Sequence, residues 1–138
     1  MKIVVARPPI FEAADAAFDF NISHTVFTYG DTLYNPGGID PIFDYILAHE
    51  AVHAVQQDHS EEKAKEWWDR YLCEPEFRAD QESRAYGVQY REMVKENRNR
   101  EHRHKILFDL SGTLSGKLYG HCIKQDKAMK LIKLYSGV

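Results

Sequence analysis

The pentad His49-Glu50-Ala51-Val52-His53 decides how the rest of this chain is interpreted. On an α-helix, residues i and i+4 lie on one face, so both imidazoles can reach the same metal ion. Glu50 lies about 100° further round the helix than His49, where it can hold a metal-bound water without being a ligand itself. Zinc lowers the pKa of such a water to about 7, and a glutamate beside it can accept the proton. The pentad therefore predicts a zinc site with Glu50 as general base.

The residues before the pentad have the spacing of an amphipathic helix. Asp40 is expected to cap this helix, with Pro41 at its first position. Apolar residues then recur at Ile42, Tyr45 and Ile46, and both histidines continue the same stripe. Two histidines one turn apart on a buried face are costly without a partner, which favours metal ligands over ordinary core residues.

A zinc site needs a third protein ligand, and Glu82 is the favoured candidate. A helix is expected to start at Pro75, which places Glu82 two turns inside it. Glu82 shares a helical face with Ala79, Tyr86 and Gln89. A helix packed on the metal helix with this face would point the Glu82 carboxylate at the two histidines.

Two other residues are candidates for the third ligand. Residues 76–80, EFRAD, resemble the ExxAD third-ligand motif of some membrane-linked zinc peptidases, but Glu76 lies in the first helical turn, where acids usually complement the helix dipole. His59 has the ligand spacing of the metzincin pattern HExxHxxGxxH, but Gln56 stands where that pattern needs a glycine. Glu76 therefore ranks second and His59 third.

Hydrolysis at such a site also needs a donor that stabilises the developing oxyanion. Tyr86, one turn past Glu82, is the candidate for this catalytic role, although a tyrosine simply packed between helices fits the same position. Gln56 and Gln57 continue the metal helix and are interpreted as its solvated end. The pair Trp67-Trp68 is interpreted as core.

The order of the remaining patterns predicts an α+β fold. Short β-rich runs occur at Lys2–Ala6, Thr25–Tyr29 and Thr32–Tyr34, and the Gly30-Asp31 pair suits a type II′ hairpin turn. The chain after these strands is mostly helical, with the HExxH helix packed on the glutamate-bearing helix. Further helices are expected after a cap at Ser60, from Pro75 to near Asn97–Arg100, around Ile106–Phe108 and over Ile123–Tyr135.

Length and charge limit the classes to which the protein can belong. The 138 residues fit a single domain over 1–138, and 43% hydrophobic with 28% charged residues argues against disorder. With 18 basic and 21 acidic side chains the net charge is −3, which does not favour a nucleic-acid binder. The basic stretch Arg91–Lys105 has no interleaved aromatic residues and is interpreted as a charged helix end and loop.

The cysteines and the apolar runs indicate the compartment. Cys73 and Cys122 are too few for a disulfide framework and are expected to be reduced thiols. Only four apolar residues follow Met1-Lys2, which is too short for a signal peptide, and no run approaches a membrane span. We therefore expect a cytoplasmic protein without a membrane partner.

These motifs together resemble a known group of zinc metallopeptidases. HExxH on one helix with a glutamate on the next is the gluzincin arrangement, and the wider layout resembles small zincin-like proteins of bacteriophages and prophages. The resemblance covers most of the chain, through Tyr29–Asp31, Tyr34–Pro36, His49–Gln57, Phe77–Tyr90 and Leu114–Gly120. It implies a zincin-like core with a β edge beside the zinc cleft, where a peptide substrate would add as a strand along Thr25–Tyr34. For a phage-encoded protein the compartment would be the host cytoplasm.

The sequence thus predicts a metallopeptidase-like hydrolase that uses one Zn²⁺ per chain to cleave a peptide or other amide bond in a peptide or protein substrate. His49, His53 and Glu82 are the expected metal ligands, with Glu50 and Tyr86 as catalytic residues. The alternative is a non-catalytic zinc protein of the same fold that acts as an interaction module. A weaker third class is a nucleic-acid accessory protein that uses Arg91–Lys105.

Overall fold

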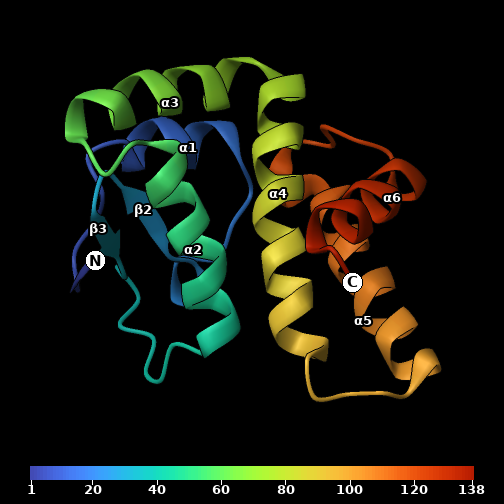
Figure 1. Ribbon diagram of the computed structural model, residues 1–138. Helices are drawn as coiled ribbons and strands as arrows, with labels where there is room; N and C mark the ends of the chain where they lie inside the picture. Colours follow the sequence, from blue (N-terminus) through green and yellow to red (C-terminus); the bar gives the residue numbers. More distant parts are fainter.

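The computed structural model describes residues 1–138 and has an α+β architecture, with six α-helices, two short 3₁₀ helices and a three-stranded sheet (Figure 1). The predicted fold class is confirmed at this level. None of the helices combines the length and apolar character needed to cross a membrane. In chain order the elements are β1 (Lys2–Val4), α1 (Phe11–Ala17), η1 (Ile22–His24), β2 (Phe27–Tyr29), β3 (Thr32–Tyr34), α2 (Asp44–Gln56), α3 (Glu61–Cys73), α4 (Pro75–Val94), α5 (Arg100–Leu114), η2 (Lys117–Tyr119) and α6 (Gln125–Ser136).

The sheet has the strand order β1-β3-β2, with β1 parallel and β2 antiparallel to β3. The predicted hairpin between β2 and β3 is confirmed, and Gly30 in its turn has a φ of +66°. A Cβ at this position would lie 3.1 Å from the backbone nitrogen of Glu61, so the turn also passes close to the start of α3. Glycine is required here for both reasons.

Helix α4 is the central element of the fold. It packs against α2 on one side and against α5 and α6 on the other, as Figure 1 shows. One apolar cluster gathers side chains of α1, β2 and α3, and a second gathers side chains of α4, α5 and α6. The α2–α4 interface lies between these clusters, and its buried side chains include polar ones: His49, His53, Glu82 and Gln89.

Helix α2, which carries the HExxH pentad, begins three residues later than predicted. Asp40 does not cap it, because Asp44 is the first helical residue and Phe43, directly before it, is extended with φ −66° and ψ 148°. The Asn35 side chain donates to the carbonyl of Ile39 and accepts from its N–H, each at 2.9 Å, which holds the preceding loop closed. The later start leaves the phase of the two histidines on the helix unchanged.

Two helical segments were predicted as other structure. The helix α1 lies in the part of the chain interpreted as strand and loop, and it has no side-chain cap at its start. The helix α5 begins at Arg100, inside the stretch Arg91–Lys105 that was interpreted as a helix end and loop. Asn99 caps it by accepting a hydrogen bond from the backbone N–H of His102 at 3.0 Å.

The close packing of α4 on α6 gives a test of the fold. A Cβ added at Gly87 would lie 2.7 Å from the Cβ of Tyr135 and 2.9 Å from its carbonyl carbon, so the two helices would have to separate. We expect Gly87→Ala to lower the free energy of unfolding by about 1–3 kcal/mol in urea titrations, although alanine favours helix.

The matched control for this substitution is Gly112→Ala in α5. A Cβ there meets only the side-chain amide of Gln125, at 3.2 Å, and that flexible group can move away. This variant should be as stable as the wild type or slightly more stable. Equal effects of the two substitutions would contradict the tight α4–α6 contact.

Candidate metal centre

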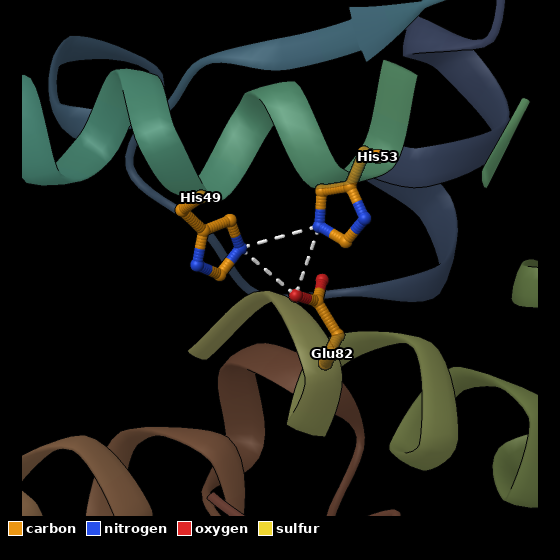
Figure 2. Close-up of side chains that lie close together, drawn as sticks. All are labelled: His49, His53 and Glu82. Carbon is orange, nitrogen blue, oxygen red and sulfur yellow. Dashed lines mark hydrogen bonds and ion pairs between the residues drawn. The ribbon is translucent and has the colours of Figure 1, made fainter. Parts of the chain in front are cut away.

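Two histidines of α2 and one glutamate of α4 converge in the interior. His49 Nε2 lies 3.0 Å and His53 Nε2 3.1 Å from Glu82 Oε1, and the two nitrogens are 3.2 Å apart. Figure 2 shows the three side chains pointing at one another from the two facing helices. The residues are only 6%, 4% and 4% exposed. This buried group could hold a metal ion.

The other two ligand candidates lie outside this group. Glu76 is exposed in the first turn of α4. His59 follows the end of α2 with a φ of +50°, and its exposed ring pairs with Asp31 Oδ1 at 2.8 Å. The structure therefore places the favoured Glu82 next to the two histidines, whereas Glu76 and His59 lie away from them.

The side-chain amides of two glutamines orient the imidazoles. Gln89 Oε1 lies 2.8 Å from His49 Nδ1, and Gln56 Oε1 lies 2.8 Å from His53 Nδ1. Because an amide oxygen only accepts, each Nδ1 carries the hydrogen. The Gln56 amide nitrogen donates to the carbonyl of Gln81 at 3.1 Å, which fixes how that amide is turned. Both Nε2 atoms are thereby directed to Glu82.

These glutamine contacts were missed by the sequence interpretation. Gln56 is not at a solvated helix end, because its side chain lies between His53 and α4. Gln57 is fully buried, and its Oε1 accepts a hydrogen bond from the backbone N–H of Gly30 in the hairpin. The i, i+3 spacing from His53 to Gln56 is the one signal in the sequence that suggests their contact.

The three converging atoms need a positive charge between them. If both imidazoles were neutral, their Nε2 lone pairs would face each other and a carboxylate in a buried space. Burial alone would lower the pKa of His53, but the Glu82 carboxylate outweighs it and raises that pKa to about 9. Burial would likewise raise the pKa of Glu82, but the two histidines lower it. A proton fills this need when no metal is bound.

The spacing of the three atoms also fits a metal ion. Ligands at 2.0–2.1 Å in a tetrahedral zinc site lie about 3.3 Å from one another. The observed separations of 3.0–3.2 Å are slightly shorter, so the side chains need to move apart by only a few tenths of an ångström. Both imidazole nitrogens and the carboxylate oxygen are ligand types that zinc accepts.

Tyr71 of α3 holds the second oxygen of the Glu82 carboxylate. Its hydroxyl donates to Glu82 Oε2 at 2.5 Å, which leaves Oε1 free to face the histidines. Burial raises the pKa of Tyr71 and the Glu82 charge raises it further, so the hydroxyl keeps its proton. The ring of Trp67 stacks on that of Tyr71, with 4.8 Å between the ring centroids, and its centroid lies 5.2 Å from that of the His53 ring. An aromatic wall therefore encloses this side of the site.

Glu50 lies beside the trio of His49, His53 and Glu82 but does not belong to it. The residue is 8% exposed, and its Oε2 accepts a hydrogen bond from Thr28 Oγ1 at 2.7 Å. Glu50 lines two cavities, of about 80 Å³ and about 240 Å³, that adjoin the site. A carboxylate in this place can accept a proton from a water at the trio. The pairing of Glu50 with Thr28 had no signal in the sequence, since it joins β2 to α2.

Tyr86 packs against His49 and shares a hydrogen bond with Tyr119. Its ring packs edge-to-face with the His49 ring, with 4.6 Å between the ring centroids, and the two tyrosine hydroxyl oxygens are 2.8 Å apart. Only one hydroxyl donates within this pair, so the hydrogen of the other is free for a second acceptor. Burial raises the pKa of Tyr86, and the Glu82 charge adds to the effect. The pair therefore stays protonated and lines the larger cavity as a donor.

The backbone carbonyl at the outer edge of β2 is already used at Thr28. The Thr28 carbonyl accepts hydrogen bonds from Gln57 Nε2 at 3.1 Å and from Trp68 Nε1 at 3.0 Å. A peptide that added as a strand along Thr25–Tyr34 would therefore find no free acceptor at Thr28. Residues 25–26, just before the strand, line both cavities. The accessible part of the site lies beside them.

Comparison with known proteins gives no relative of this chain. No family model matches it, and neither the curated proteins nor the solved structures include a match. The geometry of the site and the chemistry of its residues are therefore the basis for a function.

The charged pair in the trio predicts how the stability of the metal-free protein depends on pH. Because the pKa of His53 rises from 6.5 to about 9 on folding, its stabilisation is complete below pH 6.5 and is lost as the pH rises through 9. Glu82 has a lowered pKa, so its contribution is present above pH 4.5 and is lost on acidification. We expect the free energy of unfolding of chelator-treated protein to fall by roughly 2–3 kcal/mol between pH 6.5 and 10.

Urea titrations at a series of pH values measure this change. In His53→Gln the free energy of unfolding should no longer fall between pH 6.5 and 10. His59→Ala, which changes an exposed histidine, should show the same fall as the wild type. A profile that is the same in His53→Gln and the wild type would show that His53 carries no charge in the metal-free protein.

Proposed function

We propose that this protein is a zinc-dependent hydrolase of the gluzincin type that cleaves a peptide or other amide bond. The observation that carries the proposal is the buried convergence of His49, His53 and Glu82, at 3.0–3.2 Å, with Glu50 on the same helix beside a cavity. The HExxH pentad and its resemblance to small zincin-like phage proteins support the same assignment.

The donor set favours zinc over other ions. Magnesium and calcium prefer shells made of oxygen ligands, whereas two of the three atoms here are imidazole nitrogens. Two histidines and one glutamate form a known catalytic zinc set that leaves a fourth position for water or substrate. When bound, zinc would polarise the substrate carbonyl and lower the pKa of a coordinated water.

The roles of the protein side chains follow from their contacts. Glu50 accepts the proton of the attacking water, and the Thr28 hydroxyl holds its other oxygen in place. The hydroxyl pair Tyr86–Tyr119 donates a hydrogen bond to the oxyanion that forms as the carbonyl is attacked. Gln56 and Gln89 keep both imidazoles in the tautomer that leaves Nε2 free for the metal.

The alternative is a non-catalytic zinc protein of the same fold that acts as an interaction module. One observation favours it: the cavity that contains the trio is only about 80 Å³, which is small for a substrate. In that case the hydrogen bond of Glu50 to Thr28 would be structural. Metal content does not separate the two functions, but catalysis by a Glu50 variant does.

Zinc binding by single-site variants tests the ligand set. We expect one Zn²⁺ per chain, measured by elemental analysis and chelator competition. Losing a hydrogen-bond partner of a ligand commonly costs 10–100-fold in metal affinity, so loss of the ligand itself in Glu82→Ala should cost more than about 100-fold. Glu76→Ala and His59→Ala should bind zinc like the wild type, because both side chains lie outside the trio. Loss of zinc in Glu76→Ala with retention in Glu82→Ala would refute the assignment.

Glu50→Gln tests the catalytic part of the proposal. The amide keeps the size of the side chain and its hydrogen bond to Thr28, so zinc content should be unchanged. Without a proton acceptor, hydrolysis should fall by about 10²–10⁴-fold in digests of a broad peptide library followed by mass spectrometry. Equal cleavage by variant and wild type would place the chemistry elsewhere. Absence of cleavage by zinc-loaded wild type would favour the interaction module.

A further inference from the structure

Apart from the candidate metal ligands, Glu50 and His24, the two cavities at the site are lined by uncharged side chains. In the smaller one, the titratable acids and bases apart from tyrosine are the trio and Glu50, and in the larger one they are His49, Glu50 and the exposed His24. No lysine, arginine or aspartate lines either cavity. The chain has 18 basic and 21 acidic side chains, so their absence here is not a consequence of a low charge content.

The two cavities form the two sides of one cleft. Both are bordered by His49 and Glu50, by residues 25–26 and by Leu118 with Tyr119. The smaller cavity continues between aromatic rings such as those of Phe18, Phe20 and Phe27, and the larger continues along α4 and α5. A bond positioned at Glu50 would therefore have substrate on both sides of it.

The charge of the cleft determines which ends of a substrate it accepts. An enzyme that recognises a chain terminus must pair the terminal carboxylate or ammonium, because an unpaired charge in a low-dielectric site is unfavourable. The smaller cavity has no cation at all outside the trio, and the larger offers only His24 at its exposed rim. The catalytic glutamate is needed for proton transfer and cannot also pair a substrate amine.

We propose that the substrate is an uncharged internal segment, held on both sides of the cleaved bond by neutral groups, and that chain termini are rejected. This inference rests on the proposed hydrolase function and adds the class of substrate to it. The apolar lining of the smaller cavity favours an aliphatic group on that side of the bond.

Three hydroxamic acids test this inference because they carry the same zinc-binding group on chains of different charge. Isobutyrohydroxamate is neutral, glycine hydroxamate is cationic and succinic monohydroxamate is anionic. Zinc-loaded protein is titrated with each by calorimetry, after zinc stoichiometry has been established. We expect isobutyrohydroxamate to bind at least about tenfold more tightly than either charged probe.

A cation placed in the cleft should change this preference. Thr113 is exposed and lines only the larger cavity, so Thr113→Lys should strengthen binding of succinic monohydroxamate by about tenfold relative to isobutyrohydroxamate. The matched control is Val55→Lys, because Val55 is exposed on α2 and lines neither cavity. This control should bind all three probes as the wild type does.

The outcomes separate this inference from the function on which it rests. Failure to bind zinc would refute the hydrolase proposal before any hydroxamate is added. If zinc is bound and a charged probe binds as tightly as the neutral one, or if none of the three binds, the inference is overturned while the metal site stands.

Discussion

The packing of α2 on α4 depends on a positive charge held between two imidazole nitrogens and one carboxylate oxygen. These atoms lie within 3.2 Å of one another in a part of the protein that water barely reaches. Without that charge, three electron-rich atoms would repel at the centre of a helix interface and weaken it. The surrounding hydrogen bonds all act to keep these atoms in place.

The site also depends on the two apolar clusters that flank it. Tyr86 belongs to the cluster of α4, α5 and α6 and contacts His49, whereas Trp67 belongs to the cluster of α1, β2 and α3 and contacts His53. Each histidine is therefore packed by a different cluster. A shift of either cluster would move one imidazole relative to the other, so the geometry of the site reflects the packing of the entire protein.

The parts that could be predicted from sequence are those with a local pattern. The HExxH spacing and the inward face of α4 with Glu82 are periodic within single helices, and the structure has them where the periodicity indicates. The predicted start of α2 was wrong because hydrogen bonds of the Asn35 side chain close the loop before the helix. Helix α1 was missed because no side chain caps its start. Contacts between elements have no such pattern, which is why the role of Thr28 could not be found.

The partners around the trio determine how an ion held there would act. The two histidines are hydrogen-bonded through Nδ1 to neutral glutamine amides rather than to carboxylates. Glu82 would donate less charge to an ion, because its second oxygen accepts a hydrogen bond from the Tyr71 hydroxyl. Carboxylate partners would raise the basicity of the imidazoles and reduce the positive charge left on the ion. With neutral partners, an ion bound there would keep more of its positive charge for a further ligand. Apart from Glu50, His24 and the ligand residues themselves, the side chains that line the cleft are uncharged, so few neighbouring charges would compete with such an ion for a neutral ligand.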